Sequence, residues 1–340
     1  MQQPSILITG ATGFVGAWLV RYFAAQGWAV TATGRGEAPA PLLTRANYFR
    51  ADLRQPLLPL PADVVVHAAA LASDSAPRAD LQAANVDGTR HLFAATQHCR
   101  CFVYISSASV YDYRLAVHRE EEPVDNQRLS PYGQSKRRAE EWLRQQDWRD
   151  RTLIILRPRA VYGPGDRVLL PRLLRLVRGG RMMIPGTMRW SCSLTHVENL
   201  CAAVAGSLAF AERQRGGIHC FNVADALPYA LRMVVGQLLP AVCGRALDFR
   251  ELPLPPLYAL ARLAERLHLP TTFTRFGLDA VARSCVLDLK KIKETIDFQP
   301  ERHFEEALPE IAAWADQVGV AALRAAAADL PWRIPGSLLP

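Results

Sequence analysis

Short apolar runs separated by amphipathic stretches fill the first half of the chain. The runs lie at residues 5–9, 29–33, 64–68, 102–106 and 153–156. Nearly continuous apolar character over so few residues predicts strands that are buried on both faces. Between them, residues 15–26 and 83–98 have apolar positions at helical spacing. This alternation of strand and helix predicts an α/β fold with a doubly wound parallel sheet.

The pattern changes from about residue 161, where proline and glycine become more frequent and the helical spacing less regular. Residues 219–224 read as one more strand that rejoins the sheet. We therefore predict a sheet domain over residues 1–160, completed by strand 219–224, and a smaller C-terminal lobe over residues 161–330. Residues 331–340 are expected to form a loosely held tail.

A glycine-rich turn directly follows the first predicted strand and opens the first helix, with the sequence Thr9-Gly10-Ala11-Thr12-Gly13-Phe14-Val15-Gly16. In this context, Gly10 permits a tight turn, Gly13 lets the backbone approach a pyrophosphate, and Gly16 lets the helix pack close to the sheet. The helix N-terminus supplies N–H groups for the phosphate. The pattern predicts a dinucleotide-binding Rossmann domain rather than a purely structural turn. The candidate cofactor residues here are Gly10, Thr12, Gly13, Phe14, Val15 and Gly16.

The residues at the end of the second strand indicate which dinucleotide the domain binds. An acidic residue there would bond the ribose hydroxyls of NAD, but the sequence has Gly34 followed by Arg35. A guanidinium can hold a 2′-phosphate, so NADP(H) is preferred over NAD(H). An exposed loop arginine without a ligand is the alternative. Asp52 and Leu53, after the third strand, are expected to contact the adenine.

A tyrosine and a lysine at helical spacing form the second chemical signal, in Tyr132-Gly133-Gln134-Ser135-Lys136. Positions i and i+4 share a helix face, and a lysine ammonium close to a phenol lowers the pKa of the phenol. Tyr132 would then serve as an acid or base. Ser107 ends a central strand and can hydrogen-bond the substrate oxygen, with Ser106 and Ser109 as lesser candidates.

Composition narrows the class of protein without identifying it. The net charge of +8 comes from basic clusters with acids nearby, which favours solvated helix faces over nucleic-acid binding. Seven scattered cysteines without zinc spacing suggest reduced thiols in a cytoplasmic protein and no metal site. We expect no signal peptide. No apolar run reaches the roughly 18 residues of a transmembrane helix.

These motifs together resemble the extended short-chain dehydrogenase/reductase family, which includes nucleotide-sugar epimerases and dehydratases. The similarity covers roughly residues 4–318. It includes the glycine turn, Asp52-Leu53, His67-Ala68-Ala69-Ala70, Asn85-Val86-Asp87-Gly88-Thr89, the serine strand, the Tyr132/Lys136 pair and Arg157-Pro158. The resemblance implies that Ser107, Tyr132 and Lys136 act together and that Asn85 supports the site. It also implies that the cofactor is lined by Ala68, Ala69, Ala70 and Pro158.

The C-terminal half resembles the 3β-hydroxysteroid dehydrogenase-like branch over residues 195–200, 252–255 and 274–291. His196 stands where that branch more often has an aromatic residue, and we expect it to be structural. We favour an NADP(H)-dependent alcohol dehydrogenase or ketone reductase acting on an apolar, steroid-like or acyl-ketone substrate.

Two other functions remain open. A nucleotide-sugar epimerase or dehydratase would need basic residues to hold a diphosphate, and the candidates are Arg172, Arg175, Arg178, Arg181 and Arg189. The first three are spaced for one helix face. A non-catalytic dinucleotide sensor would not need Ser107, Tyr132 and Lys136.

Residues 257–267 are apolar along most of a predicted helix. Core packing, a lid over a hydrophobic substrate and peripheral contact with a membrane surface are the three interpretations. The resemblance also allows a homodimer.

Overall fold

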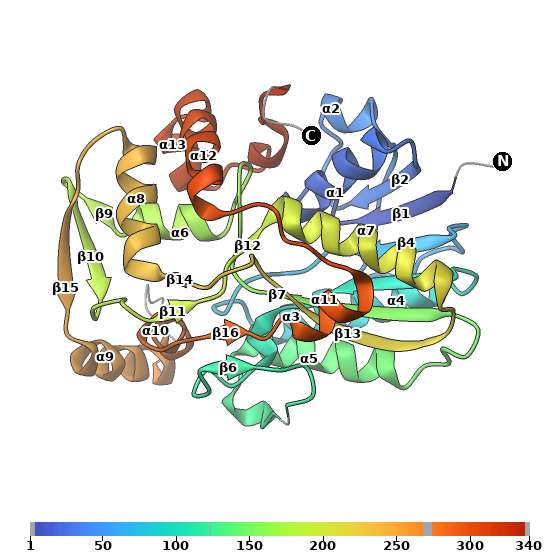
Figure 1. Cartoon of the computed structure of the whole chain (residues 1–340), viewed down its shortest axis with the longest axis horizontal. Coiled ribbons are helices and arrows are strands. Elements are labelled where there is room, and N and C mark those ends of the chain that lie inside the picture. The colour runs from blue at the N-terminus through green and yellow to red at the C-terminus, as the bar shows by residue number, and fades with distance from the viewer. Residues whose placement is uncertain (1–3, 123, 268–273, 337–340) are drawn as a thin grey trace.

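A seven-stranded parallel sheet forms the centre of the computed structural model, which describes residues 4–122, 124–267 and 274–336 (Figure 1). Every neighbouring pair of its strands is parallel. In order across the sheet the strands are β13 (Gly217–Val223), β7 (Thr152–Pro158), β5 (Cys101–Ile105), β4 (Val64–His67), β1 (Ser5–Thr9), β2 (Ala29–Gly34) and β3 (Asn47–Arg50). The predicted α/β fold with a doubly wound sheet is confirmed, and the five predicted strands lie within two residues of their observed bounds.

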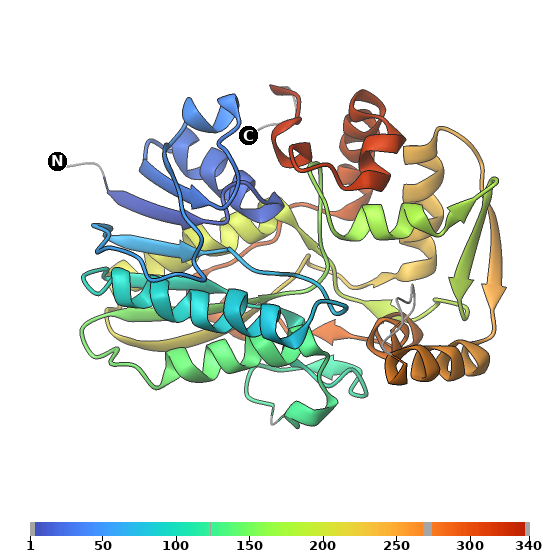
Figure 2. The same cartoon turned by 180° about the vertical axis from the view of Figure 1, so that it is seen from behind.

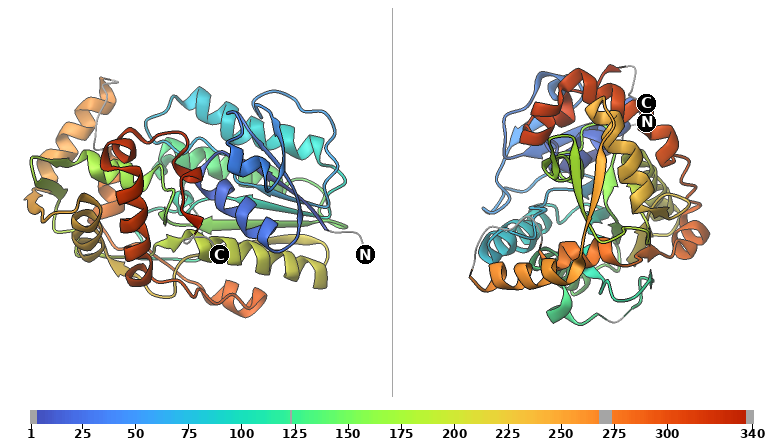
Figure 3. Two further views of the ribbon diagram at one scale, coloured as in Figure 1. Left: turned by 90° about the horizontal axis from the view of Figure 1, so that it is seen from above. Right: turned by 90° about the vertical axis from the view of Figure 1, so that its left-hand side faces the viewer.

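Helices cover both faces of this sheet, as the view from above shows (Figure 3). On one face lie α1 (Phe14–Ala25), α7 (Val197–Arg213) and α11 (Lys290–Ile296). On the other lie α3 (Arg78–Leu81), α4 (Gly88–Ala95) and α5 (Pro131–Arg144), which Figure 2 brings to the front. A hydrophobic core lies on each face of the sheet, and successive residues of β1 contribute to the two cores alternately. Ile6 and Ile8 pack with α1 and α7, whereas Leu7 packs with α4 and α5. Burial on both faces is why the strands are apolar throughout.

The smaller lobe lies beyond the carboxyl ends of the strands (left in Figure 1). It contains a three-stranded sheet of β15 (Asp248–Leu252), β10 (Arg181–Pro185) and β9 (Val177–Arg178). Its helices are α6 (Leu169–Arg175), α8 (Leu231–Cys243), α9 (Leu254–Arg266), α10 (Arg275–Ala282), α12 (Phe304–Val318) and α13 (Val320–Ala325). Short strand pairs tie the lobe together: β8 (Val161–Tyr162) with β12 (Thr195–His196), β11 (Ser191–Cys192) with β14 (Tyr229–Ala230), and β6 (Val117–His118) with β16 (Val286–Leu287).

The helix predicted over residues 83–98 is longer and less regular than its apolar spacing suggested. It begins at α3, continues through a π-helical stretch over Gln82–Asp87, and ends with α4. The division of the chain at residue 160 remains a prediction. Two helices that follow this point, α7 and α11, pack on the sheet of the first domain.

The expectation of a loosely held tail is wrong for residues 331–336, while residues 337–340 lie outside the described residues. Trp332 and Ile334 are buried against the sheet domain. The Trp332 indole donates a hydrogen bond to the Ala11 carbonyl (3.2 Å), and Arg21 of α1 donates to the Pro331 carbonyl (2.6 Å). The Arg21 guanidinium also stacks on the Trp332 ring. Residues 331–336 are therefore part of the fold.

Core packing is also the wrong interpretation for most of helix α9. Within that helix only Ala261 is buried, while Leu260 and Leu263 are 62% and 54% exposed, and Leu267 just beyond it is 58% exposed. The lid and the membrane-surface interpretations both remain predictions.

Two negative findings hold for the parts of the chain that the structure describes. None of these helices is long and apolar enough to cross a membrane. No cluster of three or more histidine, cysteine or acidic side chains is arranged to hold a metal ion.

Candidate active site

The glycine turn between β1 and α1 has the close contacts that its sequence predicts. Gly10 adopts a positive φ of 72°, and a Cβ atom there would lie 2.8 Å from the Ala69 backbone. A Cβ atom at Gly16 would collide with the Gly10 carbonyl, so this glycine lets α1 start directly against the turn. Helix α1 has no side-chain cap and no acid in its first turn. Its first N–H groups are therefore available to an anion.

The far end of the turn faces the end of β2. The Thr12 side chain lies against Gly34, and the Tyr48 hydroxyl donates a hydrogen bond to the Gly34 carbonyl (2.9 Å). Arg35 is exposed, and its carbonyl accepts a hydrogen bond from Nε of Arg50 (2.8 Å). Two arginines thus lie together where an NAD-binding carboxylate would otherwise stand.

Asp52 and Leu53 follow β3. Asp52 forms an ion pair with Arg54 (2.6 Å), and this hydrogen bonding lowers the pKa of the Asp52 carboxyl. Leu53 is buried, and its carbonyl bonds His91 of α4.

Asn85 links the segment after β4 to helix α5. Its side-chain oxygen accepts a hydrogen bond from the Leu71 N–H (2.8 Å), and its amide nitrogen donates to Ser135 of α5 (2.8 Å). The Ala69 N–H donates to Thr9 Oγ1 (3.2 Å), which joins the segment Ala68, Ala69 and Ala70 to the end of β1. Asn85 therefore holds two sides of the site together.

Ser107 and Tyr132 come from neighbouring segments at the carboxyl edge of the sheet. Ser107 follows β5, and its hydroxyl donates to Ser109 Oγ (3.1 Å). The Ser109 hydroxyl lies 3.4 Å from the Tyr113 hydroxyl. Burial raises the pKa of Tyr132, and hydrogen bonding with Ser107 only partly offsets this effect. At neutral pH the phenol is protonated.

Lys136 is buried one helical turn after Tyr132. Its ammonium donates to the Ile105 carbonyl (2.6 Å) and lies 4.4 Å from the centre of the Tyr104 ring. Burial lowers the pKa of Lys136 to about 7. Burial stabilises the neutral form of both groups, so it raises the pKa of Tyr132 and lowers that of Lys136. The predicted lowering of the Tyr132 pKa by this lysine is not found, because Lys136 is not among the charges that shift it.

Gly133 is a site residue that sequence reasoning missed. A Cβ atom there would collide with the Ser109 carbonyl, so only glycine lets α5 approach the serine loop this closely. Ser130 caps the same helix by accepting a hydrogen bond from the Gly133 N–H (3.0 Å). Together these contacts fix the distance between Tyr132 and the serines.

A buried ion pair supports the same helix. Arg157 of β7 binds Glu140 of α5 through two nitrogens (3.0 and 2.6 Å), and both side chains are 1% exposed. Ser106 donates to the same carboxylate. From the sequence, Arg157 can be recognised only as part of a motif, because its partner Glu140 lies on a different element, α5.

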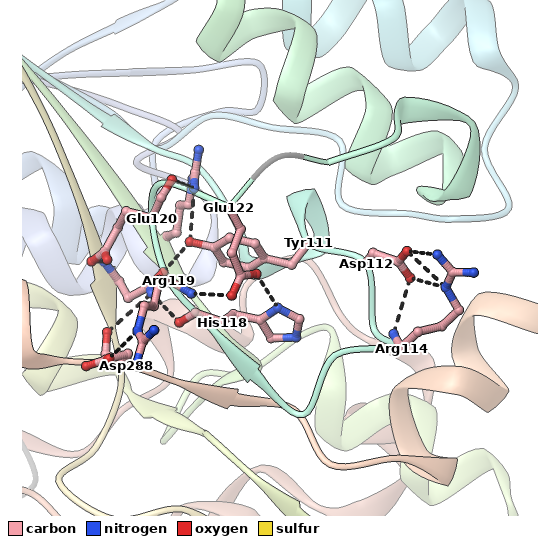
Figure 4. A network of polar contacts seen from close by, with 10 residues as sticks. Tyr111, Asp112, Arg114, His118, Arg119, Glu120, Glu122 and Asp288 are labelled. Carbon is pink, nitrogen blue, oxygen red and sulfur yellow. Dashed lines mark hydrogen bonds and ion pairs between the residues drawn. The ribbon is translucent and has the colours of Figure 1, made fainter.

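The remaining bonds of Arg157 reach the loop that precedes α5. Its guanidinium donates to the Tyr111 hydroxyl (2.9 Å) and to the Glu120 carbonyl (3.1 Å). Figure 4 shows Tyr111 and its neighbours, with His118 stacked on the Tyr111 ring and bonded to Glu122. The loop is thereby attached to the core behind the site.

Three of the five arginines considered for a diphosphate contact different segments, and a fourth lies on a strand. Helix α6 ends at Arg175, and Arg178 lies on strand β9, so the predicted common helix face is wrong. Arg172 donates to the Ala72 carbonyl (3.1 Å), while Arg175 points to the Arg324 carbonyl. Arg181 lies beside Asp248.

His196 occupies a structural position. It precedes α7, accepts a hydrogen bond from the Glu198 N–H and is fully buried. Burial lowers its pKa to about 3, so it is neutral. Pro158, the last residue of β7, pairs with Val223 in β13.

Comparisons with known proteins place this chain in one family and identify several relatives. Residues 6–224 match the model of the NAD dependent epimerase/dehydratase family. The 2-alkyl-3-oxoalkanoate reductase of Stenotrophomonas maltophilia is 29% identical over 91% of this chain and 98% of its own. A 4-hydroxy-2-methyl-3-oxo-4-farnesyl-3,4-dihydroquinoline-1-oxide ketoreductase of Stigmatella aurantiaca is 30% identical over 76% of this chain and 79% of its own.

Two further similarities extend this comparison. A sterol-4-alpha-carboxylate 3-dehydrogenase of Candida albicans is 29% identical over 50% of this chain and 54% of its own. Among solved structures, the UDP-glucuronic acid 4-epimerase of Bacillus cereus in complex with NAD has a TM-score of 0.71 at 19% identity, over 92% of this chain and 99% of that one.

Proposed function

The chain belongs to the NAD dependent epimerase/dehydratase family, of the extended short-chain dehydrogenase/reductase type, and on that premise we propose that it is an NADP(H)-dependent reductase of apolar ketones. The observation that carries this proposal is the grouping of Ser107, Tyr132 and Lys136 at the carboxyl edge of the sheet, beside the glycine turn. Open α/β sheets bind their ligands at this edge.

The residues of the turn fit a dinucleotide. Gly10 and Gly16 leave no room for side chains, and the uncapped start of α1 offers N–H groups to a pyrophosphate. Arg35 and Arg50 at the ends of β2 and β3 supply positive charge suited to a 2′-phosphate, which favours NADP(H) over NAD(H). When bound, the cofactor supplies the hydride.

The side chains of this protein would hold the carbonyl oxygen of the substrate and supply its proton. Ser107 would hold the carbonyl oxygen of the ketone, and Tyr132 would donate a proton to it. Because burial raises the pKa of Tyr132, the phenol carries the proton that a reduction consumes. Lys136, one turn away on α5 and bonded to the Ile105 carbonyl, would help to hold the ribose next to the nicotinamide.

Two observations favour a ketone over a nucleotide-sugar. Two relatives that match most of this chain are named as a reductase of a 2-alkyl-3-oxoalkanoate and a ketoreductase of a farnesyl-bearing compound, and both names include an apolar group. In this chain, three of the five arginines considered for a diphosphate contact different segments. An epimerase is the second candidate.

The test combines cofactor binding with turnover. NADPH and NADH are titrated by fluorescence, and NADPH consumption is followed with long-chain ketones and with nucleotide-sugars. We expect tighter binding of NADPH and its net consumption by ketones. The variant Tyr132→Phe should lose at least about 100-fold in turnover, whereas Tyr22→Phe on α1 should not. Product from a nucleotide-sugar without net cofactor change would contradict the proposal and support the epimerase.

A further inference from the structure

Arg159 is a buried cation without a carboxylate partner. The residue is 7% exposed. Its two terminal nitrogens donate to the Ser193 carbonyl (2.9 Å) and the Ala280 carbonyl (3.1 Å), and its Nε has no hydrogen-bond partner. Every aspartate and glutamate of the chain lies within the described residues, and none of them forms an ion pair with Arg159. A buried charge in this condition lowers the stability of the fold.

The groups next to Arg159 do not neutralise it. Cys192 and Cys285, paired across a β-bridge, and the Tyr113 ring surround the guanidinium. Burial raises the pKa of the Cys285 thiol, so that this thiol is uncharged at neutral pH. Arg157, two residues earlier, is in contrast fully neutralised by Glu140.

The position of Arg159 connects it to the catalytic group. It follows the last residue of β7, at the edge of the sheet where the site lies. Its guanidinium lies 5.9 Å from the centre of the Tyr113 ring. The hydroxyl of that ring lies 3.4 Å from Ser109 Oγ, which in turn bonds Ser107. A single aromatic ring therefore separates the cation from the serines expected to hold the substrate oxygen.

We propose that Arg159 binds a carboxylate of the substrate, so that the substrate class is a ketone acid with its carboxylate close to the reacting carbonyl, as in a 3-oxo acid. This inference rests on the proposed ketone reduction. The missing counter-ion is then supplied by the substrate itself. A guanidinium is the side chain best suited to bind a carboxylate.

A single carboxylate fits this cation better than a diphosphate. A diphosphate carries at least two charges and needs several cations, but Arg157 is already paired and Arg172 is exposed. Arg21 offers a useful contrast, since it is also buried without an ion pair, yet it stacks on the Trp332 ring and bonds the Pro331 carbonyl. It provides the matched control.

The turnover test compares 3-oxododecanoate with its methyl ester, which keeps the ketone and the chain but removes the charge. The quantity measured is the ratio of kcat/KM for the acid to that for the ester. The variant Arg159→Gln should lower this ratio by about 30-fold or more, the usual effect of truncating one partner of a buried charge pair. Arg159→Lys should restore part of it, and Arg21→Gln should keep it. The proposal would be overturned if Arg159→Gln lowered kcat/KM equally for acid and ester. It would also be overturned if Arg172→Gln, rather than Arg159→Gln, lowered the ratio.

A binding test separates this inference from the proposed function. The affinity of 3-hydroxydodecanoate and of its methyl ester is measured by calorimetry on the Tyr132→Phe protein saturated with NADPH, where no turnover is needed. If the acid binds more tightly than the ester, and the Arg159→Gln variant loses this difference, the carboxylate site is supported. This holds even if the wild-type protein reduces no ketone and the proposed function fails. Equal affinity for acid and ester refutes the carboxylate site, even if ketones are reduced.

Discussion

The ion pair between Glu140 and Arg157, which joins α5 to β7, is expected to contribute measurably to the free energy of unfolding. In Glu140→Gln the carboxylate charge is lost while the shape remains. Both side chains are 1% exposed, so Arg157 would stay buried without an anion. Breaking a buried pair from one side costs about 3–5 kcal/mol. With a urea slope of about 3 kcal/mol per molar, the midpoint of unfolding should fall by about 1–1.7 M.

The assay is urea unfolding followed by tryptophan fluorescence and by circular dichroism. The neighbouring variant Glu141→Gln is the matched control, because Glu141 pairs with Arg137 on the surface of the same helix, with its side chain 42% exposed. It should change the free energy of unfolding by less than about 1 kcal/mol. A midpoint for Glu140→Gln that matches the control would refute the reasoning.

The same pair predicts a dependence of stability on pH. Burial works to raise the pKa of Glu140, but the charge and hydrogen bonds of Arg157, with the Ser106 hydroxyl, outweigh it and leave this pKa below its usual value. A lowered pKa in the folded state means that the stabilisation is present above the unfolded pKa of about 4.3 and is lost as the pH falls below it. The difference between wild type and Glu140→Gln should therefore shrink in acid.

Three further predictions concern the site. Gly133→Ala should lower kcat/KM by about 100-fold, because the new methyl group displaces Tyr132 from the serines by about 1 Å, whereas Gly236→Ala, in open space on α8, should not. Trp332→Ala should weaken NADPH binding in a fluorescence titration, while the exposed Trp190→Ala should leave it unchanged, and equal affinities in the two variants would contradict a role for the chain end. Arg35→Asp should weaken NADPH binding by about 10- to 100-fold relative to NADH, and an unchanged ratio would remove this arginine from the 2′-phosphate site.

The features that were predictable from the sequence are those that depend on neighbouring residues. A strand buried on both faces must be apolar throughout, so the central strands could be located within two residues. The glycine turn needs only its own backbone and the helix that follows it. The pair Tyr132 and Lys136 is visible because one helical turn separates its members.

The features that were missed depend on contacts between distant parts of the chain. Gly133 matters because of a carbonyl in another loop, and Arg159 is notable for a counter-ion that no residue supplies. The composition of the last residues resembles that of a free tail, yet Trp332 bonds a residue 321 positions earlier. Arg178 has helical spacing from Arg172 but lies on a strand, since the helix ends first.

The bond between Trp332 and Ala11 also has a consequence for biosynthesis. A ribosome adds about 5–20 residues per second, so the glycine turn is made roughly 16–64 s before the indole that contacts it. During this interval the nascent chain has its glycine turn without the segment that contacts it. The turn therefore reaches its final surroundings only after residues 330–336 have been made and have docked.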